Sequence, residues 1–517
     1  MTQADLSKAY DELPYNSRSY LSSQPSQLWS VGKLFGLDVI DYKHCRVLEL
    51  GCASGGNIIT AAAAYPESTF IGIDYSEKQI ATGQSMIRDA GLTNIELKCL
   101  SIEDVRDDLG EFDYIIAHGL LSWVPSELQP VVFDICSNNL SASGLAYISF
   151  NAYPAWHFYE GLRKMMQYHL MPLKDKSQSH RSQQARSLVK FLAENSQADD
   201  RHYGHILKDE YELLTSQTLS YIAHDYLEEN NHPFYFSDVI EMANKKGLQY
   251  LIDANLPSVF DGNFKPEAQK ALSEQNLDLI AKEQYMDMLL NRRFRQVILC
   301  KKSFQVSRHV HTSAIKDMAF YTNIHTSTND HDTATKYFLG EQEITIEGEI
   351  PKALNDILIA ANGMAISFDD LLTQASFQVN ESVQVVEPIL LDNAVRMVFY
   401  GAWGLCAERG QFTTELSEKP EVCPVVRAML KNNSWFNSRR YQSIQLQSFE
   451  AALIMYLDGS RSRTQLLEDS INDIRSGKLR LSKYGKSMAS YEDIETEMKS
   501  VWDQVLSFCT QQAIMVA

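Results

Sequence analysis

The stretch LELGCASGGN, residues 48–57, decides the fold, because an apolar segment runs into a glycine-rich turn and then into NIITAAAAY, a segment of small helix-forming residues. A strand, a turn and a helix of this kind open an α/β sheet that binds a ligand at the carboxyl ends of its strands. Further strands are predicted at TFIGID (69–74), IELKCL, DYIIAH and LAYISF, each after a helix or a turn. Near-continuous apolar strands that alternate with helices predict a doubly wound, mostly parallel α/β sheet.

Two later strands complete this sheet. Residues 155–230 are rich in Gln, Ser, His and Tyr and have no strand alternation, so we interpret them as a helical insertion. The helix FSDVIEMANKKG, with Gly247 as its stop, leads into the strand LQYLIDANL. The strand FRQVILCKK (294–302) follows the helix IAKEQYMDMLL. We therefore expect seven strands and a first domain that spans residues 1–305.

The rest of the chain is predicted to form two smaller domains. A middle α+β domain, residues 306–394, has the polar loop TSTNDHDTATK, the strand EITIEGEI and a helix that ends at Gly363. The C-terminal domain, residues 395–517, contains SFEAALIMYLDGSRSRTQLLEDSI, which predicts a helix, a tight turn and a second helix that begins near Ser462 or Thr464. This arrangement resembles a winged helix, and a generic helical hairpin fits it equally well.

Composition limits the classes of function. The 517 residues are 44% hydrophobic and 22% charged, which is ordinary globular make-up for more than one domain. The sequence begins without an apolar signal segment and has no apolar run of membrane-spanning length, so we expect a cytoplasmic protein without membrane insertion. The eight cysteines show no CxxC spacing, which predicts reduced thiols. The net charge of −19 argues against nucleic-acid binding and mildly favours a cationic partner.

Two classes of ligand fit the glycine-rich turn. Read as GxAxxG, with Asp74 about 20 residues further on, the turn is compatible with a dinucleotide, whose pyrophosphate would face the helix amides. Read as ExGxAxG, from Glu49 to Gly55, it matches the motif for S-adenosylmethionine. Glu49 favours the second interpretation, because a carboxylate beside the turn repels a pyrophosphate but attracts an ammonium or sulfonium group. We therefore predict S-adenosylmethionine as the cofactor.

The predicted cofactor site extends over the ends of the first four strands. Asp74 is placed to accept both ribose hydroxyls, and its alternative role is that of a turn residue before a helix capped by Ser76 and Gln79. Tyr75 would lie against the ribose or the adenine. The predicted cofactor-binding residues are Glu49, Gly51, Cys52, Ala53, Gly55, Asn57, Asp74, Tyr75, Gln79, Ser101, Ile102, Glu103, His118 and Gly119.

Further stretches carry a resemblance to a known family. They are YDELPY (10–15), VLELGC (47–52), GIDYSEKQIATG (72–83), GEFDYIIAHGLLSWVP (110–125), FNAYPAWH (150–157), HDYLEENNHPFYF (224–236), GLQYL (247–251) and NRRFRQVILCKK (291–302). Together they resemble the class I S-adenosylmethionine-dependent methyltransferases that carry a methyltransferase regulatory domain, and more narrowly the bacterial outer-membrane-protein lysine methyltransferases. The resemblance covers most of residues 10–305 and implies a homodimer, with a looser likeness at LDGSRSRTQLL near the C-terminus.

Two residues depart from the family pattern. Ala53 stands where the pattern has a second glycine, and alanine is sterically close to it. Ser101 stands where an acid usually follows the third strand, so the adenine contact at this position differs from that of the family. The resemblance also implies that YDELPY, stiffened by Pro14, forms an N-terminal lid over the cofactor.

The acceptor side has to hold a nucleophile against the methyl group and exclude water, because methyl transfer is an in-line displacement. A lysine acceptor must also lose its proton, since on the order of one amine in a thousand is neutral at pH 7. Desolvation and a nearby sulfonium lower the pKa of that amine, and aromatic walls hold the cationic product. The candidate wall residues are Trp123, Tyr153, Trp156 and Tyr15, although loop packing explains any one of them equally well.

His118 opens the stretch HGLLSWVP (118–125) at the end of the fourth strand. It is a candidate catalytic base, but the lack of a paired carboxylate nearby favours a positioning role. Cys52 is interpreted as a small apolar filler of the turn and not as a nucleophile. The segments HYGH (202–205), HVH (309–311) and NDHD (329–332) mimic metal-ligand spacings without a full set of companions, so no metal is predicted.

Three functions remain open from these observations. The preferred one is a protein methyltransferase that modifies lysine side chains of a protein such as a surface protein. The alternatives are a small-molecule O- or N-methyltransferase and a non-catalytic scaffold that binds the cofactor. The size of residues 306–517 favours a macromolecular partner, because a small acceptor needs only a lid.

Overall fold

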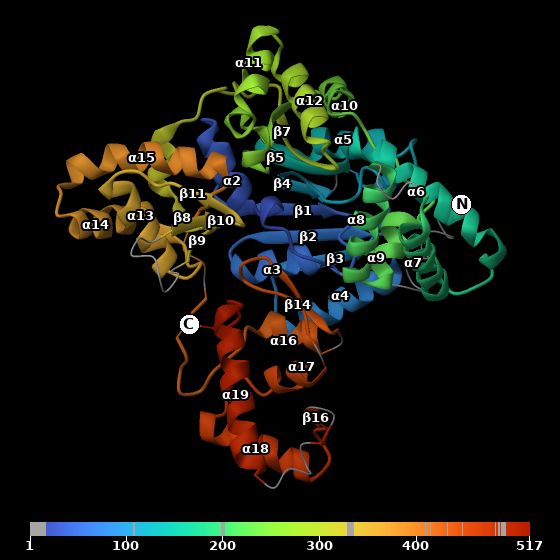
Figure 1. Cartoon of the computed structure of the whole chain (residues 1–517), viewed down its shortest axis with the longest axis vertical. Helices are drawn as coiled ribbons and strands as arrows, with labels where there is room; N and C mark the ends of the chain where they lie inside the picture. The colour runs from blue at the N-terminus through green and yellow to red at the C-terminus, as the bar shows by residue number, and fades with distance from the viewer. Residues whose placement is uncertain are drawn as a thin grey trace.

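A seven-stranded sheet with helices on both faces forms the centre of the molecule (Figure 1). The residues described by this computed structural model are 17–106, 109–197, 202–327, 336–408, 410, 412–413, 415–431, 433–446, 448–480, 482–483, 486–487 and 493–516. The described residues do not include Tyr15, the segment YDELPY or NDHD, whose spacing mimics that of metal ligands. No helix in the described part combines the length and the apolar character that a membrane span requires.

The strand order of the central sheet is β3-β2-β1-β4-β5-β7-β6, and β7 runs antiparallel to both of its neighbours. This order confirms the predicted seven-stranded, mostly parallel sheet. The strands are β1 (Arg46–Leu50), β2 (Thr69–Asp74), β3 (Ile95–Cys99), β4 (Phe112–Ala117), β5 (Leu140–Asn151), β6 (Leu248–Asp253) and β7 (Phe294–Lys301).

Both faces of the sheet are buried, which explains the near-continuous apolar strands of the sequence. Val47 and Tyr114 belong to the core on one face, while Leu48 and Ile115 belong to the core on the other. Helices α2 (Pro25–Leu34), α3 (Gly56–Ala64) and α4 (Glu77–Ala90) cover the first face. Helices α5 (Gln129–Asn139) and α10 (Phe236–Lys245) cover the second, and α11 (Pro266–Glu274) and α12 (Leu279–Leu290) follow α10 in the chain.

Local signals of the sequence start and stop several of these helices. The Ser76 hydroxyl accepts a hydrogen bond from the backbone N–H of Gln79, as the predicted cap at the start of α4 requires. Gly91 ends α4 at φ +69°, and Gly247 follows α10 at φ +77°. Both glycines adopt the left-handed conformation that ends a helix at low cost.

The predicted insertion is helical and has a core of its own. Its helices are α6 (Ala155–Leu170), α7 (Gln178–Asn195), α8 (His202–Ser216) and α9 (Leu219–Tyr226). Met166, Val189 and Leu207 pack in a cluster that is separate from both cores of the sheet. The insertion therefore forms a small helical unit beside the carboxyl ends of the strands (Figure 1).

The middle region contains two small antiparallel sheets and three helices. Strands β9 (Ile324–Ser327), β10 (Lys336–Leu339) and β11 (Gln342–Ile344) form one sheet, and β8 (Ala319–Thr322), β12 (Ile366–Ser367) and β13 (Trp403–Cys406) form the other. The helices are α13 (Glu349–Ala360), α14 (Phe368–Val379) and α15 (Val383–Tyr400). The prediction that all of EITIEGEI is a strand is wrong. Only Glu343 and Ile344 of this stretch lie in β11. Gly348, at φ +90°, then turns the chain into α13.

The C-terminal region contains α16 (Pro424–Leu430), β14 (Trp435–Asn437), β15 (Ser443–Gln445), α17 (Ser448–Ile454), α18 (Arg463–Arg475), β16 (Ser482–Lys483), β17 (Lys486–Ser487) and α19 (Ile494–Gln511). A capping box between Ser462 and Gln465 begins α18, so Ser462 is the cap and not Thr464. The predicted boundary between residues 394 and 395 falls inside α15, and β13 pairs with β8. We propose that this boundary lies after Cys406, while the predicted boundary at residue 305 stays a prediction.

Candidate active site

The glycine-rich turn after β1 is held open by an unusual backbone. Gly51, Ala53 and Gly55 all have positive φ, at +68°, +50° and +77°. Asp74, at the end of β2, fixes this turn, because one carboxylate oxygen accepts the backbone N–H of Ala53 and the other accepts that of Ser76, both at 2.9 Å. Asp74 thus has a role in shaping the turn, and its predicted role at the ribose stays a prediction.

Gly56 allows the N-terminal segment to lie directly on the turn. A Cβ at this position would stand 2.0 Å from the backbone oxygen of Ser17. The backbone N–H of Gly56 donates to the Ser17 hydroxyl at 2.7 Å, and that hydroxyl faces the Cys52 carbonyl at 3.4 Å. No side chain larger than hydrogen fits at Gly56 without displacing this segment.

Glu49 provides a carboxylate oxygen that lacks a partner. The residue is 4% exposed, and its Oε1 accepts a hydrogen bond from Asn57 at 2.7 Å. Its Oε2 is buried without a hydrogen-bond partner in the described structure. Burial raises the pKa of Glu49 to about 8. A buried acceptor of this kind calls for a donor, and the ammonium group of S-adenosylmethionine supplies one, so the residues present fit the predicted cofactor.

Asn57 connects Glu49 to the N-terminal segment. Besides its bond to Glu49, its side-chain oxygen accepts the backbone N–H of Tyr20 at 2.9 Å and the side-chain amide of Gln24 at 2.7 Å. These partners occupy the Asn57 amide, so the side chain positions the segment and the carboxylate. A role as a direct cofactor ligand stays a prediction.

A cavity of about 320 Å³ lies at the carboxyl ends of the strands, and we call it the carboxyl-edge cavity. The predicted residues that line it are Glu49, Gly51, Cys52, Ala53, Asn57, His118, Gly119, Trp123 and Trp156. The lining residues that sequence analysis missed are Ser17, Arg18, Tyr20, Asn151, Tyr221, His224, Asp225, Arg293 and Phe294. The glycine-rich turn, the segment after β4 and the helical insertion therefore line one cavity.

Other predicted residues do not line this cavity. They are Gly55, Asp74, Tyr75, Gln79, Ser101, Ile102, Glu103 and Tyr153. The side-chain nitrogen of Gln79 is buried without a protein partner among the described residues, which leaves it available to a ligand. Ser101 caps the short 3₁₀ helix Ile102–Asp104 by accepting the N–H of Glu103. The Tyr153 ring stacks on His157, with ring centroids 4.0 Å apart, and its hydroxyl donates to Glu160.

His118 is enclosed by aromatic rings at the end of β4. It stacks on Tyr20 with ring centroids 3.5 Å apart, and its Nδ1 is 2.9 Å from the Tyr147 hydroxyl. Burial lowers the pKa of His118 to about 3. The imidazole is therefore neutral at pH 7 and a weak proton acceptor, which supports the positioning role over base catalysis.

The acceptor side of the cavity combines aromatic rings with one carboxylate. Trp123 and Trp156 meet edge to face with ring centroids 6.4 Å apart, and the indole N–H of Trp156 donates to the Arg293 carbonyl. Asp225, on α9, lines the same cavity. Desolvation raises the pKa of Asp225 to about 7, against the attraction of Arg293 and Arg18.

Asp225 could have been noticed from the sequence, because it stands inside HDYLEENNHPFYF. The helical pattern gave no reason to place an insertion residue at the carboxyl ends of the strands. As for metals, the described residues contain no group of three His, Cys, Asp or Glu side chains arranged to hold an ion.

Comparisons with family models divide the chain into three matched parts. Residues 41–209 match a methyltransferase domain. Residues 218–301 match the predicted methyltransferase regulatory domain, and residues 418–514 match the C-terminal winged helix domain of PKMT. The match at 418–514 confirms the winged-helix prediction over that of a generic hairpin.

Individual relatives agree with this arrangement. The chain is 32% identical to the uncharacterized protein RP789 of Rickettsia prowazekii, over 98% of this chain and 93% of that protein. A second R. prowazekii protein, RP028, is 36% identical over 47% of this chain and 96% of its own length. The solved structure of PKMT2 from Rickettsia typhi in complex with AdoHcy superimposes with a TM-score of 0.85 at 27% identity, covering 98% of this chain and all of that one.

Proposed function

Because the chain belongs to the family of S-adenosylmethionine-dependent methyltransferases that combine a regulatory domain with a PKMT-type winged helix, we propose that it methylates lysine side chains of a protein substrate, such as a surface protein. The observation that carries this proposal is the carboxyl-edge cavity, where the unpartnered oxygen of Glu49 shares one space with the Trp123–Trp156 wall and Asp225. In this cavity, Glu49 would contact the cationic cofactor and Asp225 would contact the cationic acceptor.

Residues around the glycine-rich turn bind and orient the cofactor. S-adenosylmethionine, when bound, supplies the methyl group. Glu49 receives its ammonium group, and Asp74 holds the turn and accepts ribose hydroxyls. Neutral His118 stacks on Tyr20, and its Nδ1 lies 2.9 Å from the Tyr147 hydroxyl. Ser17 and Asn57 keep the N-terminal segment in place, which limits the access of water.

Residues on the acceptor side prepare the lysine amine. Trp123 and Trp156 enclose the amine and disfavour its charged form by desolvation. The Asp225 carboxylate accepts the proton that the ammonium has to lose, since a pKa of about 7 leaves a large fraction of this carboxylate ionised at neutral pH. The tryptophan faces then retain the methylated, still cationic product by cation–π contact. Tyr15 and Tyr153 stay candidates for further contacts.

The same proposal includes a cytoplasmic homodimer. The helical insertion carries large apolar side chains at its surface, among them Phe158 at 55% and Phe191 at 60% exposure. Exposed apolar side chains of this size favour a protein partner, and a second copy of the chain covers them in the arrangement that we propose.

Incubation with labelled cofactor and a whole-cell lysate, followed by separation by mass, tests the function. The expected result is label on lysine side chains of protein, lost in Asp74→Ala. Label confined to small extractable metabolites would instead support a small-molecule methyltransferase. Binding of S-adenosylhomocysteine with no transfer to any fraction would support the scaffold.

A further inference from the structure

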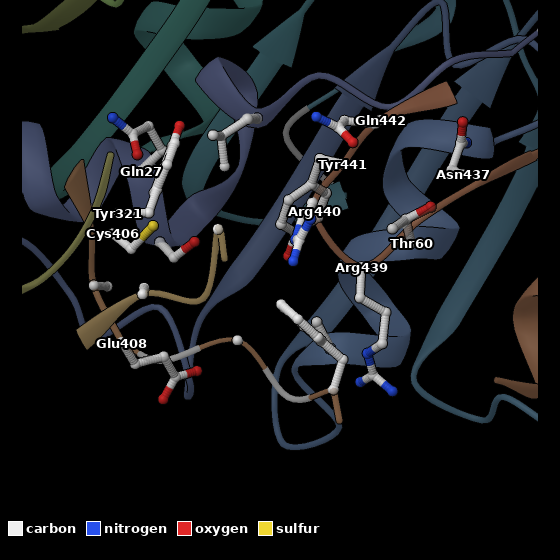
Figure 2. Close-up of a pocket in the computed structure, with 18 of the residues that line it drawn as sticks. Gln27, Thr60, Tyr321, Cys406, Glu408, Asn437, Arg439, Arg440, Tyr441 and Gln442 are labelled. Atoms are coloured by element: carbon white, nitrogen blue, oxygen red, sulfur yellow. The ribbon is translucent and has the colours of Figure 1, made fainter. Parts of the chain in front are cut away.

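A second cavity, of about 390 Å³, lies where the methyltransferase core, the middle region and the C-terminal region meet. Its walls come from α2 and the end of α3, from β8 and β13, and from the loop after β14. Figure 2 shows Cys406 and Glu408 on one side, Thr60 and Asn437 on the other, and Arg440 with Tyr441 between them. We call this space the junction cavity.

The junction cavity lies farther along α3 than the carboxyl-edge cavity. Asn57, in the first turn of α3, lines the carboxyl-edge cavity, whereas Thr60, Ala63 and Ala64 line the junction cavity. The two cavities share no lining residue in the described part of the chain. The junction cavity is therefore a separate site and not an extension of the cofactor pocket.

Two residues that line the junction cavity each have a polar atom that is buried without a partner in the described structure. The atoms are Oε1 of Gln27 and Nε of Arg440. The rest of the Arg440 guanidinium is held firmly, since Nη1 donates to the Gln511 carbonyl at 3.1 Å and Nη2 to the Asn362 carbonyl at 3.2 Å. A fixed, buried donor without an acceptor points to a ligand.

The charges of the cavity indicate which kind of ligand it takes. Its charged lining residues in the described part of the chain are Glu408, Arg439 and Arg440. The Glu408 carboxylate is neutralised by Lys43, with an N–O distance of 2.6 Å. The guanidinium group of Arg440 therefore attracts an anion to this wall, in a chain whose net charge is −19. Apolar side chains such as Ala63, Ala64, Val425 and Val426 supply much of the remaining wall.

We propose that the junction cavity binds a small organic acid with an apolar body. Its carboxylate lies against Arg440, and its apolar body lies against the alanines of α3 and the valines of α16. The loop that carries the arginines has a special backbone, since Tyr441 is held at φ +57°. Three regions of the chain close around this ligand, so its binding stabilises their mutual arrangement.

Asn437 links the junction cavity to the glycine-rich turn. This residue lines the cavity, is 1% exposed, and donates its side-chain amide to the Ser17 carbonyl at 3.3 Å and to the Gly56 carbonyl at 3.0 Å. Occupancy of the junction cavity thereby changes the affinity for the cofactor. This coupling, unlike the binding itself, rests on the proposed function.

Calorimetric titration of the full-length protein with naphthalene-2-carboxylate, and with the neutral isostere naphthalene-2-carboxamide, tests the binding. The acid should bind with one site per chain and at least tenfold more tightly than the amide. Arg440→Gln should remove this preference, and Ala64→Phe, which fills the cavity and keeps both arginines, should abolish binding. Arg475→Gln, an exposed arginine at the end of α18, is the matched control and should bind like the original chain.

Equal binding of acid and amide, or undiminished binding by folded Ala64→Phe, would overturn the site. The coupling is tested by titrating S-adenosylhomocysteine with and without saturating naphthalene-2-carboxylate. A change of at least threefold in its dissociation constant is expected, and an unchanged constant would overturn the coupling alone. Failure of S-adenosylhomocysteine to bind at all would count against the proposed function and leave the junction site standing.

Discussion

The two cavities of this chain differ in how their residues are distributed along the sequence. Residues 49–57, a strand end, a glycine-rich turn and the start of a helix, contribute Glu49, Gly51, Cys52, Ala53 and Asn57 to the carboxyl-edge cavity, and the rest of its lining extends from residue 17 to residue 294. The junction cavity draws on residues from 21 to 442, and its parts meet only after three regions have packed together. A short sequence motif predicts the first site, whereas the second site can be recognised only in the folded structure.

The cavities also differ in charge. The carboxyl-edge cavity carries the carboxyl groups of Glu49 and Asp225 together with Arg18 and Arg293, and Arg293 is already paired with Glu210 and Tyr226. The junction cavity presents Arg440, while its carboxylate is neutralised by Lys43. We therefore expect cationic ligands at the first site and an anionic ligand at the second.

The largest expected effect comes from Asp225→Asn. Removal of the proton acceptor should lower kcat about 100-fold while the affinity for S-adenosylhomocysteine stays the same. Because the ionised carboxylate is the active form, kcat of the original chain should rise with pH through about 7 and then level off. Steady-state kinetics from pH 6 to about pH 9 measure both effects.

The matched control for this prediction is Asp209→Asn, an exposed aspartate on α8. It should leave kcat and its pH profile unchanged. If the pH profile of Asp225→Asn follows that of the unmodified protein, Asp225 is not the base. The proposed contrast between an acidic carboxyl-edge cavity and a basic junction cavity would then lose its support from Asp225.

Gly56→Ala should weaken cofactor binding about 50-fold, because the new Cβ clashes with the Ser17 carbonyl and strain of this kind costs about 1–3 kcal/mol. Calorimetric titration with S-adenosylhomocysteine measures the loss. Gly161→Ala is the control, since a Cβ there meets no described atom within 4 Å and Gly161 lies on α6, away from the turn. Equal affinities for the two variants would show that the N-terminal segment does not shape the cofactor site.

Glu49→Gln should weaken cofactor binding about tenfold, by the loss of one charged contact. Without a ligand, Glu49 is largely protonated below its pKa of about 8. A bound cation stabilises the ionised carboxylate of Glu49 and so lowers this pKa. Binding should therefore release a proton, and affinity should rise as the pH increases towards 8. Titrations in two buffers of different ionisation enthalpy detect the proton.

In Glu49→Gln the proton release should disappear, whereas Glu77→Gln, on the exposed first turn of α4, should retain it. Proton release that persists without Glu49 would assign the titrating group elsewhere.

The smallest effect is expected for His118→Ala. Loss of the stacking contact with Tyr20 should weaken binding of S-adenosylhomocysteine about fivefold, the equivalent of about 1 kcal/mol. Turnover at saturating cofactor should stay close to that of the original chain, because the imidazole is neutral and a weak base. A fall in kcat with unchanged affinity would instead make His118 the base. The control is His205→Ala, an exposed histidine on α8 outside both cavities.

The sheet and the conformation of the glycine-rich turn were predictable from the sequence, for physical reasons. Strands buried on both faces are continuously apolar, and a turn with positive φ at Gly51 and Gly55 requires glycine, so both features leave a local record. The role of Glu49 as a cofactor ligand stays a prediction, and the structure adds that its Oε2 is buried without a partner among the described residues.

The acceptor wall and the junction cavity were not predictable in this way. Asp225 belongs to α9, whose pattern shows only that it is helical, and its position beside Trp123 depends on how the insertion packs. Asn437 contacts Gly56 across 381 positions of the sequence. No periodicity or spacing records contacts of that range, and they follow only from tertiary packing.

Peptide mass spectrometry of a lysate treated with the enzyme and isotopically labelled S-adenosylmethionine tests most directly the claim that the carboxyl-edge cavity methylates lysine. We predict labelled methyl groups on lysine Nζ atoms of protein for the original chain and for Asp209→Asn, and their near-complete loss for Asp225→Asn. Labelled methyl groups on other atoms, or undiminished lysine labelling by Asp225→Asn, would contradict the account.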